Sequence, residues 1–265
     1  MLSRWPCAVI AGWVCTAAPA WAQQGRIDTD GPDFVESTES VARGRVQFEA
    51  GTLLEQERRN GARIATRSTP LLLKAGLGAG VEARLETVGA VRMTGEDAAG
   101  APAHLSGSAD TALGLKWHVR DRDANAGAPA LAWIAHLEAP SGSGALRGQG
   151  WRPSLRAVIG WDLPHEASIG LMPGLRWDAR GDGRRYLAGI FGAVAGLKLT
   201  PRWRVFGELQ AAQIAHARDG GVLLYQNLGA AYMLADDWQI GMRAGWAANR
   251  NTPTRYALLA LAGRF

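Results

Sequence analysis

From Arg45 to Phe265, apolar and polar residues alternate along the chain in segments of about 8 to 14 residues. Clusters of Gly, Asp, Asn and Pro separate these segments, and stripes with helical spacing are absent from the pattern. Alternation with a period of two predicts strands that have two unlike faces. The predicted strands are residues 45–56, 64–75, 80–91, 108–119, 129–139, 151–162, 166–178, 185–199, 202–215, 222–234, 238–248 and 254–265. Pro70 and the apolar run that follows it predict a bulge in the second strand.

The connections between these segments alternate in length. The gaps at 76–79, 163–165, 200–201 and 235–237 are short, whereas residues 92–107 and 140–150 form long predicted loops. Residues 120–128 make a longer gap than a strict alternation would give. Short turns at one end and long loops at the other are typical of a transmembrane antiparallel up-and-down β-barrel. We therefore expect an all-β barrel of about 12 strands, with both termini periplasmic. Counts of ten and fourteen, and a periplasmic β-sandwich, are the alternatives.

Aromatic residues lie near the ends of the predicted strands. Trp117, Trp133, Trp161, Trp203, Tyr232 and Trp238 fall toward the short-turn end, and Trp151, Trp177 and Trp246 fall toward the other end. Two aromatic belts around an apolar band are expected of a barrel in a bilayer, whereas a soluble sandwich more often buries Trp in mid-strand. Twelve tilted strands would give a backbone cylinder of roughly 24 Å, with a bore of roughly 10 Å or less.

The first 22 residues have the features of a secretory signal. Arg4 is followed by an apolar stretch, and Ala20-Trp21-Ala22 is a cleavage site of the small-x-small type. Both cysteines, Cys7 and Cys15, lie within this segment, so the mature chain is expected to have no disulfide and no thiolate chemistry. We therefore expect a signal peptide at 1–22, an acidic periplasmic segment at 23–44 and a barrel at 45–265. The formal net charge is +5, but its basic residues are scattered, which argues against nucleic-acid binding.

The most distinctive local sequence, Thr29-Asp30-Gly31-Pro32-Asp33-Phe34-Val35-Glu36-Ser37, precedes the first strand. Together with Gly44 to Gly51, it resembles the opening of the outer-membrane "transporter" family, also labelled the meta-pathway phenol-degradation family. Further resemblances follow in order at residues 69–77, 81–85, 108–116 and 139–142. The sequence departs from the family at Gly31, where Arg is usual, and at Ala75, where an aromatic residue is common. The resemblance implies an outer-membrane barrel that moves small solutes of hydrophobic or aromatic character.

The acidic segment contributes the first set of candidate site residues. We expect it to lie at or inside the periplasmic mouth, where its carboxylates could pair with lumen arginines and hold the segment as a plug. A hard cation bound by carboxylate oxygens and a solvated tail are the alternatives. The plug or gate candidates are Asp30, Pro32, Asp33 and Glu36.

Charged residues on the inward faces of the strands form the second set. They could act as a selectivity ring, or as a salt-bridge network that fills a narrow barrel. The lumen-lining candidates are Glu49, Glu82, Arg84, Lys116, His136, Arg156, Glu208 and Arg243, within a wider set that also contains Glu86, His118, Glu138, Arg152, Arg176, Lys198 and Arg204. Arg84, Lys116 and Glu208 are the candidates that we expect to matter most.

We expect a channel or porin-like transporter in the outer membrane of a Gram-negative cell, for passage of small solutes. The alternatives are a closed structural or surface-interaction barrel and a lipid-modifying barrel enzyme. We expect no enzyme activity, cofactor or metal, because no histidine lies in a nucleophile motif; His118 and His136, near Glu138, form only a weak constellation. The expected partners are outer-membrane lipid, a small-molecule solute and the barrel-assembly machinery, for which the C-terminal Phe265 resembles an assembly signal.

Overall fold

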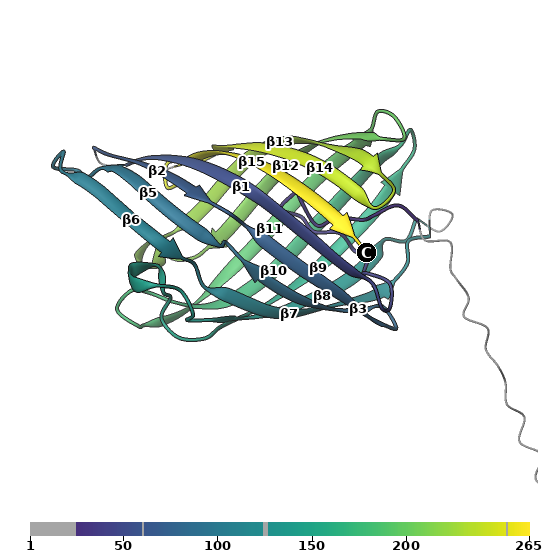
Figure 1. Ribbon diagram of the computed structural model, residues 1–265, viewed down its shortest axis with the longest axis horizontal. Coiled ribbons are helices and arrows are strands. Elements are labelled where there is room, and N and C mark those ends of the chain that lie inside the picture. Colours follow the sequence, from purple (N-terminus) through teal and green to yellow (C-terminus); the bar gives the residue numbers. More distant parts are fainter. Residues whose placement is uncertain (1–24, 60, 124–126, 253) are drawn as a thin grey trace, which may run out of the picture.

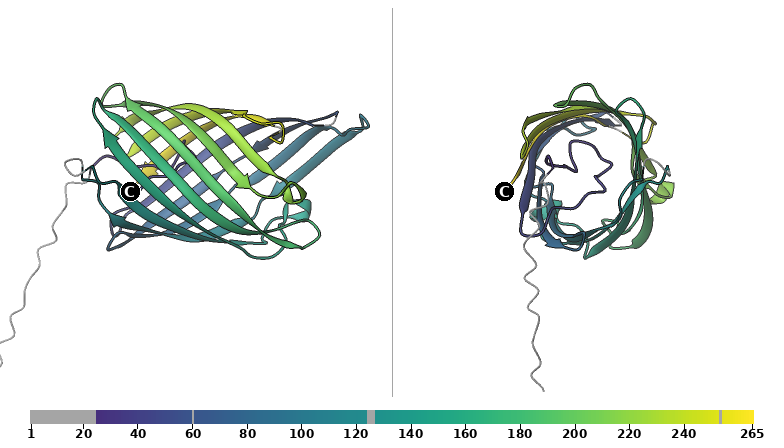
Figure 2. Two further views of the ribbon diagram at one scale, coloured as in Figure 1. Left: turned by 180° about the vertical axis from the view of Figure 1, so that it is seen from behind. Right: turned by 90° about the vertical axis from the view of Figure 1, so that its right-hand side faces the viewer.

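The computed structural model describes residues 25–59, 61–123, 127–252 and 254–265, which form one closed antiparallel barrel (Figures 1 and 2). The predicted signal peptide lies outside the described residues. Among those residues, no helix is long and apolar enough to cross a membrane. The strands are β1 (Val46–Arg59), β2 (Ala62–Ser68), β3 (Leu71–Gly78), β4 (Val81–Thr87), β5 (Ala90–Glu96), β6 (Pro102–Ser108), β7 (Thr111–Arg120), β8 (Ala130–Ala139), β9 (Arg152–Leu163), β10 (Ala167–Ala179), β11 (Arg185–Lys198), β12 (Trp203–Ile214), β13 (Val222–Ala235), β14 (Trp238–Ala247) and β15 (Thr254–Arg264).

Three barrel strands are each broken once, so that two labelled strands form one barrel strand. β1 pairs with β3 over one half of its length and with β2 over the other half, and β4/β5 and β6/β7 continue the same arrangement. The first break falls at Thr69–Pro70, where Pro cannot donate a ladder hydrogen bond. Counted in this way the barrel has twelve strands, and pairing of β15 with β1 closes it. The prediction of a twelve-stranded all-β barrel is confirmed.

Residues 92–107, predicted as a long loop, mostly form a hairpin. β5 and β6 pair from Ala90–Ser108 to Glu96–Pro102, and with β2 they project beyond the neighbouring strands (Figure 1). Alternation was hard to see here, because the outward positions Arg92, Thr94 and Glu96 are polar and the inward ones include Gly95. We call β2, β5 and β6 the extension. Residues 140–151 form a loop with one 3₁₀ turn, η1 (Gly144–Leu146).

The two ends of the barrel differ. At the end where the N-terminal segment enters, which we call the turn end, β3 and β4 are joined by two residues and β13 and β14 by two. The opposite end, the loop end, carries most of the longer connections, including that between β8 and β9 and the turn with η2 (Ala217–Asp219), whereas the turn end carries one long connection, between β7 and β8. Short turns face the periplasm in outer-membrane barrels, so this asymmetry gives the barrel an orientation.

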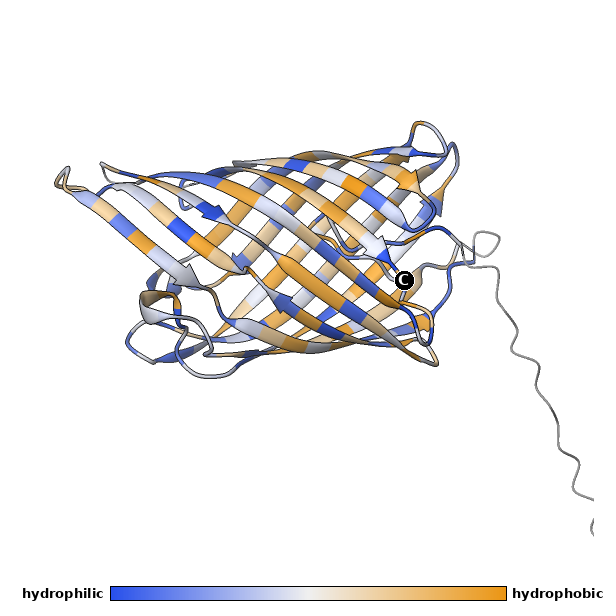
Figure 3. Ribbon diagram, in the orientation of Figure 1, coloured by the Kyte–Doolittle hydropathy of each residue, from blue (hydrophilic) through white to orange (hydrophobic). Residues whose placement is uncertain are grey.

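Large apolar side chains lie on the outside of the barrel. On β7, Leu113, Leu115 and Trp117 are exposed by 60%, 52% and 52%, whereas the alternate residue Lys116 is fully buried in the lumen. Figure 3 shows the apolar residues distributed along the strands. This inverted pattern, apolar outside and polar inside, suits a wall that faces lipid.

The ends of the chain meet where the barrel closes. Val46 and Phe265 exchange two backbone hydrogen bonds, of 3.1 and 2.8 Å. The Phe265 ring stacks on Phe48 at 6.2 Å and meets Trp238 edge to face at 5.8 Å between ring centroids. Phe265 therefore completes an outward aromatic cluster across β1, β14 and the last residue.

Candidate functional site

Residues 25–45, the N-terminal segment, run inside the barrel before β1 begins. The right-hand view of Figure 2, which looks into the turn end, shows this segment looped within the lumen. Ile27, Asp30, Val35, Thr38 and Val41 have exposed fractions of 5 to 7%. Such burial contradicts the solvated-tail alternative.

Asp30 lies at the centre of a cluster of cations from three strands. Its carboxylate is 2.9 Å from Lys74 Nζ, 2.9 Å from Arg84 Nη1 and 2.5 Å from Lys116 Nζ. Burial alone raises the pKa of the Asp30 carboxyl, but Lys116, Lys74 and Arg84 outweigh that effect and hold the pKa well below its ordinary value. The carboxylate is therefore ionised, and these cations already occupy the positions that a bound metal ion would need.

Glu36 and Asp33 make three further ion pairs with the wall. Glu36 lies 2.6 Å from Arg84 Nη2 and 2.8 Å from Arg156 Nη1. Burial raises the pKa of Glu36, but Arg84 and Arg156 outweigh that effect and the net pKa is lowered. Asp33 accepts two hydrogen bonds from Arg204, at 3.1 and 2.7 Å. Burial nevertheless keeps the pKa of Asp33 above its ordinary value.

The carboxylates of the wall, in turn, accept hydrogen bonds from the backbone of the N-terminal segment. Glu49 accepts from the Asp30 and Gly31 amides at 2.9 and 2.7 Å. Glu208 accepts from the Phe34 and Val35 amides, both at 2.8 Å, and Glu82 accepts from the Val41 amide at 2.8 Å. A buried backbone amide left without an acceptor is costly. Three predicted lumen residues therefore satisfy an irregular segment that has no sheet partner along most of its length.

An apolar contact complements the polar ones. Val35 is part of a buried cluster, with Phe34 packed against it. The wall residues of this cluster come from β8 to β12 and are Ala132, Ile134, Val158, Met172, Val194 and Phe206. The lumen thus has an apolar wall on β8 to β12, interrupted by the charged Arg156, Arg204 and Glu208, and an ionic wall on β1, β3, β4 and β7.

Inward glycines make room for the segment at its closest approaches. A Cβ at Gly192 would lie 2.6 Å from Val35 Cγ2 and 3.0 Å from the Phe34 ring, and one at Gly241 would lie 2.7 Å from Pro32. Real Cβ atoms essentially never make contacts this short. The wall is therefore shaped to fit the segment. We call the inward-facing wall residues that contact the segment the seat; they include Glu49, Lys74, Arg84, Lys116 and Glu208.

The remaining predicted lumen residues lie around this seat. Arg243 pairs with Glu208 at 3.2 Å, and Glu208 also accepts a hydrogen bond from Asn227 at 2.8 Å. His136 is buried and its Nδ1 is 3.3 Å from Glu86. His118 and His136 are on adjacent strands, but the register places His136 opposite Gly114 and His118 opposite Ala132. They are therefore not neighbours, and the weak constellation with Glu138 is not assembled.

His118 instead joins a different group of possible metal ligands. Glu39, His118 and Asp121 each offer a ligand atom, all within 4.8 Å of one another. In this arrangement His118 Nδ1 donates to the Thr38 carbonyl and Nε2 is 2.8 Å from Asp121. Arg122 lies 3.5 Å from Glu39. The group therefore works as a polar contact between the N-terminal segment and the β7–β8 connection.

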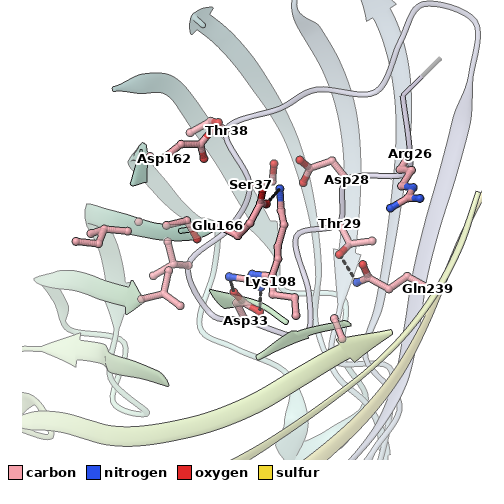
Figure 4. A pocket seen from close by; sticks show the side chains of 18 of the residues that line it. Arg26, Asp28, Thr29, Asp33, Ser37, Thr38, Asp162, Glu166, Lys198 and Gln239 are labelled. Carbon is pink, nitrogen blue, oxygen red and sulfur yellow. Dashed lines mark hydrogen bonds and ion pairs between the residues drawn. The ribbon is translucent and has the colours of Figure 1, made fainter. Parts of the chain in front are cut away.

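A cavity of about 800 Å³ lies between the N-terminal segment and the turn-end halves of β9 to β13 (Figure 4). Its lining combines apolar residues of the wall with charged residues of both signs, including Asp33, Asp162, Glu166 and Lys198. Lys198, a predicted lumen residue, is largely exposed at the rim and lies 3.8 Å from Glu166. The cavity would hold a small organic molecule.

Sequence reasoning missed Lys74 and Gln47 among the residues that hold the segment. Lys74 contacts both Asp30 and Glu49, and Gln47 donates to the Asp28 carbonyl at 2.8 Å. The run Leu71-Leu72-Leu73 concealed the alternation that places Lys74 inward. The two-residue alternation of Glu82 and Arg84, continued backwards through the tight turn, places Lys74 on the same inward face.

Residues 29–265 match the model of a protein family described as "Putative MetA-pathway of phenol degradation". The chain belongs to this family. The resemblance seen in the opening motif and strands is therefore confirmed over nearly the whole described chain. No curated protein sequence is significantly similar to this one.

Solved structures support the same fold. A COG4313 outer membrane channel from Pseudomonas putida F1 is similar with a TM-score of 0.64 and 14% identity, covering 86% of this chain and 98% of that one. The KdgM porin in complex with disordered oligogalacturonate gives a TM-score of 0.51 at 10% identity, covering 81% and 99%. The translocator domain of autotransporter NalP from Neisseria meningitidis gives 0.51 at 14%, covering 83% and 88%. The family member described here is thus an outer-membrane β-barrel, and these similar structures are channels and transport units rather than enzymes.

Proposed function

We propose that this barrel is a gated outer-membrane channel for small solutes and that its N-terminal segment is the plug. The observation that carries the proposal is the seat itself. Plug carboxylates Asp30, Asp33 and Glu36 meet cations of the wall, and wall carboxylates meet amides of the plug. The contacts are numerous and polar, so the plug is held firmly, yet it is joined covalently to the barrel only through β1.

The seat makes movement of the plug physically reasonable. Buried ion pairs gain little net free energy over their solvated forms, because desolvation of the charges offsets the attraction between them. Charged groups on both surfaces would be rehydrated when the plug withdraws toward the periplasm. A docked and an undocked state that differ by a few kcal/mol are therefore compatible with these contacts.

The two-sided lumen supports small amphipathic solutes as the cargo. Withdrawal of Phe34 and Val35 would uncover the apolar wall on β8 to β12, and withdrawal of Asp30 would uncover Lys74 and Lys116 opposite. An apolar ring that carries a hydroxyl or a carboxylate fits such a passage. The phenol-degradation description of the family agrees with this class of solute.

A reversible cross-link tests the proposal. The mature chain has no cysteine if it begins at Gln23, since Cys7 and Cys15 precede that residue. A Cβ at Gly170 would lie 3.1 Å from Val35 Cγ1, so Val35→Cys with Gly170→Cys places two thiols within disulfide reach. We expect the oxidised protein in a planar bilayer to stay closed and reduction to restore channel openings, with Val35→Cys alone as control. Equal conductance in the oxidised and reduced forms would contradict the plug.

A further inference from the structure

The outer surface of the barrel changes character abruptly toward the loop end. On β1 the outward residues from Val46 to Leu54 are apolar or Thr, whereas the next two outward positions are Gln56 and Arg58. Eight residues of a tilted strand rise about 20 Å along the barrel axis. The apolar part of β1 is therefore about as tall as the hydrocarbon band of an outer-membrane barrel, and Arg58 lies beyond it.

Arginines from four neighbouring strands gather at this level, on the outside of the barrel. The residues of this arginine face are Arg58, Arg63, Arg67, Arg92 and Arg255, and all five are exposed. Arg58 pairs in register with Arg63, and Arg67 with Arg92. Figure 3 shows polar positions interrupting the strands of the extension. Glu96, opposite Arg63, brings the only negative charge to the outward positions of these described strands.

The arginine face has few internal partners, unlike the lumen. No ion pair within the described residues involves Arg58, Arg63, Arg67 or Arg92, and Arg255 donates only to Gln56, at 2.9 and 2.6 Å. Like charges directly opposite each other on paired strands are destabilising. Anionic groups from outside the chain would relieve the repulsion within these two arginine pairs.

A cavity in the same surface supplies a place for an anion. It has a volume of about 410 Å³, and its lining residues are Leu54, Glu55, Gln56, Ala65, Thr66, Arg67, Arg92 and Thr94. Arg67 and Arg92 are its two cations, and Leu54 and Ala65 give it apolar surface. Guanidinium groups bind phosphate oxygens through two parallel hydrogen bonds. Phosphate at the boundary between polar and apolar surface fits this lining.

The level of the arginine face along the barrel identifies the source of the phosphate. Gly245 of β14 pairs with Tyr256 of β15. One residue further toward the loop end, Trp246 and Arg255 therefore lie side by side. Trp246 is 48% exposed, and outward Trp residues mark the interface of the bilayer. We propose that the arginine face binds the phosphorylated headgroup of a glycolipid in the outer leaflet, with Arg67 and Arg92 as the primary contacts.

Native mass spectrometry of the detergent-solubilised mature barrel tests this site. The probe is lipopolysaccharide carrying both lipid A phosphates, titrated against the same material after phosphate removal and against inorganic phosphate. The wild-type barrel should bind the phosphorylated lipid most tightly, and millimolar inorganic phosphate should not displace it. Each arginine at a membrane surface contributes about fivefold in affinity, so Arg67→Gln with Arg92→Gln should weaken binding roughly 30-fold.

The matched control is Arg184→Gln with Arg185→Gln, which removes two exposed loop-end arginines near β11. It should bind like the wild type. Heat-modifiable gel mobility checks that each barrel is closed, and Arg67→Lys with Arg92→Lys, which keeps the charge, should bind at an intermediate level. Unchanged binding by the glutamine variant, equal binding of the dephosphorylated lipid, or full displacement by inorganic phosphate would overturn the proposal.

Discussion

The Lys116 ammonium on β7 lies 2.5 Å from the Asp30 carboxylate in the N-terminal segment, and Lys116 is fully buried. Lys116 also donates to the Ser37 carbonyl at 2.9 Å. One wall residue thus fixes two points of the segment, seven residues apart. The position of the N-terminal segment therefore depends on the charges of Lys116 and Asp30.

Replacing Asp30 with Asn should loosen the plug. The variant leaves Lys74, Arg84 and Lys116 together with one carboxylate fewer, and loss of one partner from a buried ion pair costs about 3–5 kcal/mol. We expect faster maleimide labelling of a cysteine placed at Val35 and a higher open probability. Asp182→Asn, in the exposed turn after β10, serves as control. A labelling rate equal to that of the Val35→Cys parent would count against the role of Asp30.

Acid should release the plug. The pKa values of Asp30 and Glu36 are lowered in the docked state, so their contribution to docking is complete above the ordinary carboxyl pKa, near 4, and is lost as pH falls through the depressed values. Asp33, whose pKa is raised, contributes with the opposite sign, because its protonation favours docking.

We therefore expect the open probability of the channel in a planar bilayer to be constant from about pH 7 to 5 and to increase below about pH 4. The increase should be shallower after Asp30→Asn and steeper after Asp33→Asn. An open probability that is flat down to pH 3 in all three proteins would show that these charges do not control docking.

A larger side chain at Gly192 should displace the plug without opening the barrel wall. A Cβ there meets Val35 and Phe34, whereas a Cβ at the outward Gly207 meets only Leu228, at 3.6 Å. Gly192→Val should raise the conductance, and Gly207→Val should leave it unchanged. Equal conductance of the two variants, with circular dichroism showing intact barrels, would mean that the plug does not block the path.

Removal of the Phe265 ring should weaken closure of the barrel. Phe265→Ala loses two aromatic contacts, with Phe48 and Trp238, together worth about 1–3 kcal/mol. We expect a lower urea midpoint for the refolded protein and less protein in the outer membrane. Replacement by Trp should restore both. A full wild-type yield of the alanine variant in cells would argue against a role for this residue in assembly.

Most of the fold could be predicted from the sequence, because alternation in a two-faced wall is local information. Trp117 and Lys116, one residue apart, already define the outside and the inside of β7. Within the extension, most of β2 lies in the strand predicted at 64–75, but the β5–β6 hairpin could not be predicted, since polar residues at its outward positions remove the apolar face that signals a strand. The break before Pro70 was visible only as an irregularity.

The candidate site was predictable residue by residue but not as an assembly. The inward orientation of Glu49, Glu82 and Glu208 follows from alternation, whereas their pairing with plug amides depends on where an irregular segment lies. No period relates Asp33 to Arg204, which are 171 residues apart. Long-range ion pairs of this kind are set by the closed geometry of the barrel.

The central claim is that the N-terminal segment closes the channel. Single-channel recording in a planar bilayer, comparing the mature protein with a version that lacks residues 23–42, tests it most directly. The plug account predicts brief or small openings in the intact protein and a large, steady conductance after the deletion. Equal conductance in both forms, or silence in both with intact barrels, would contradict it.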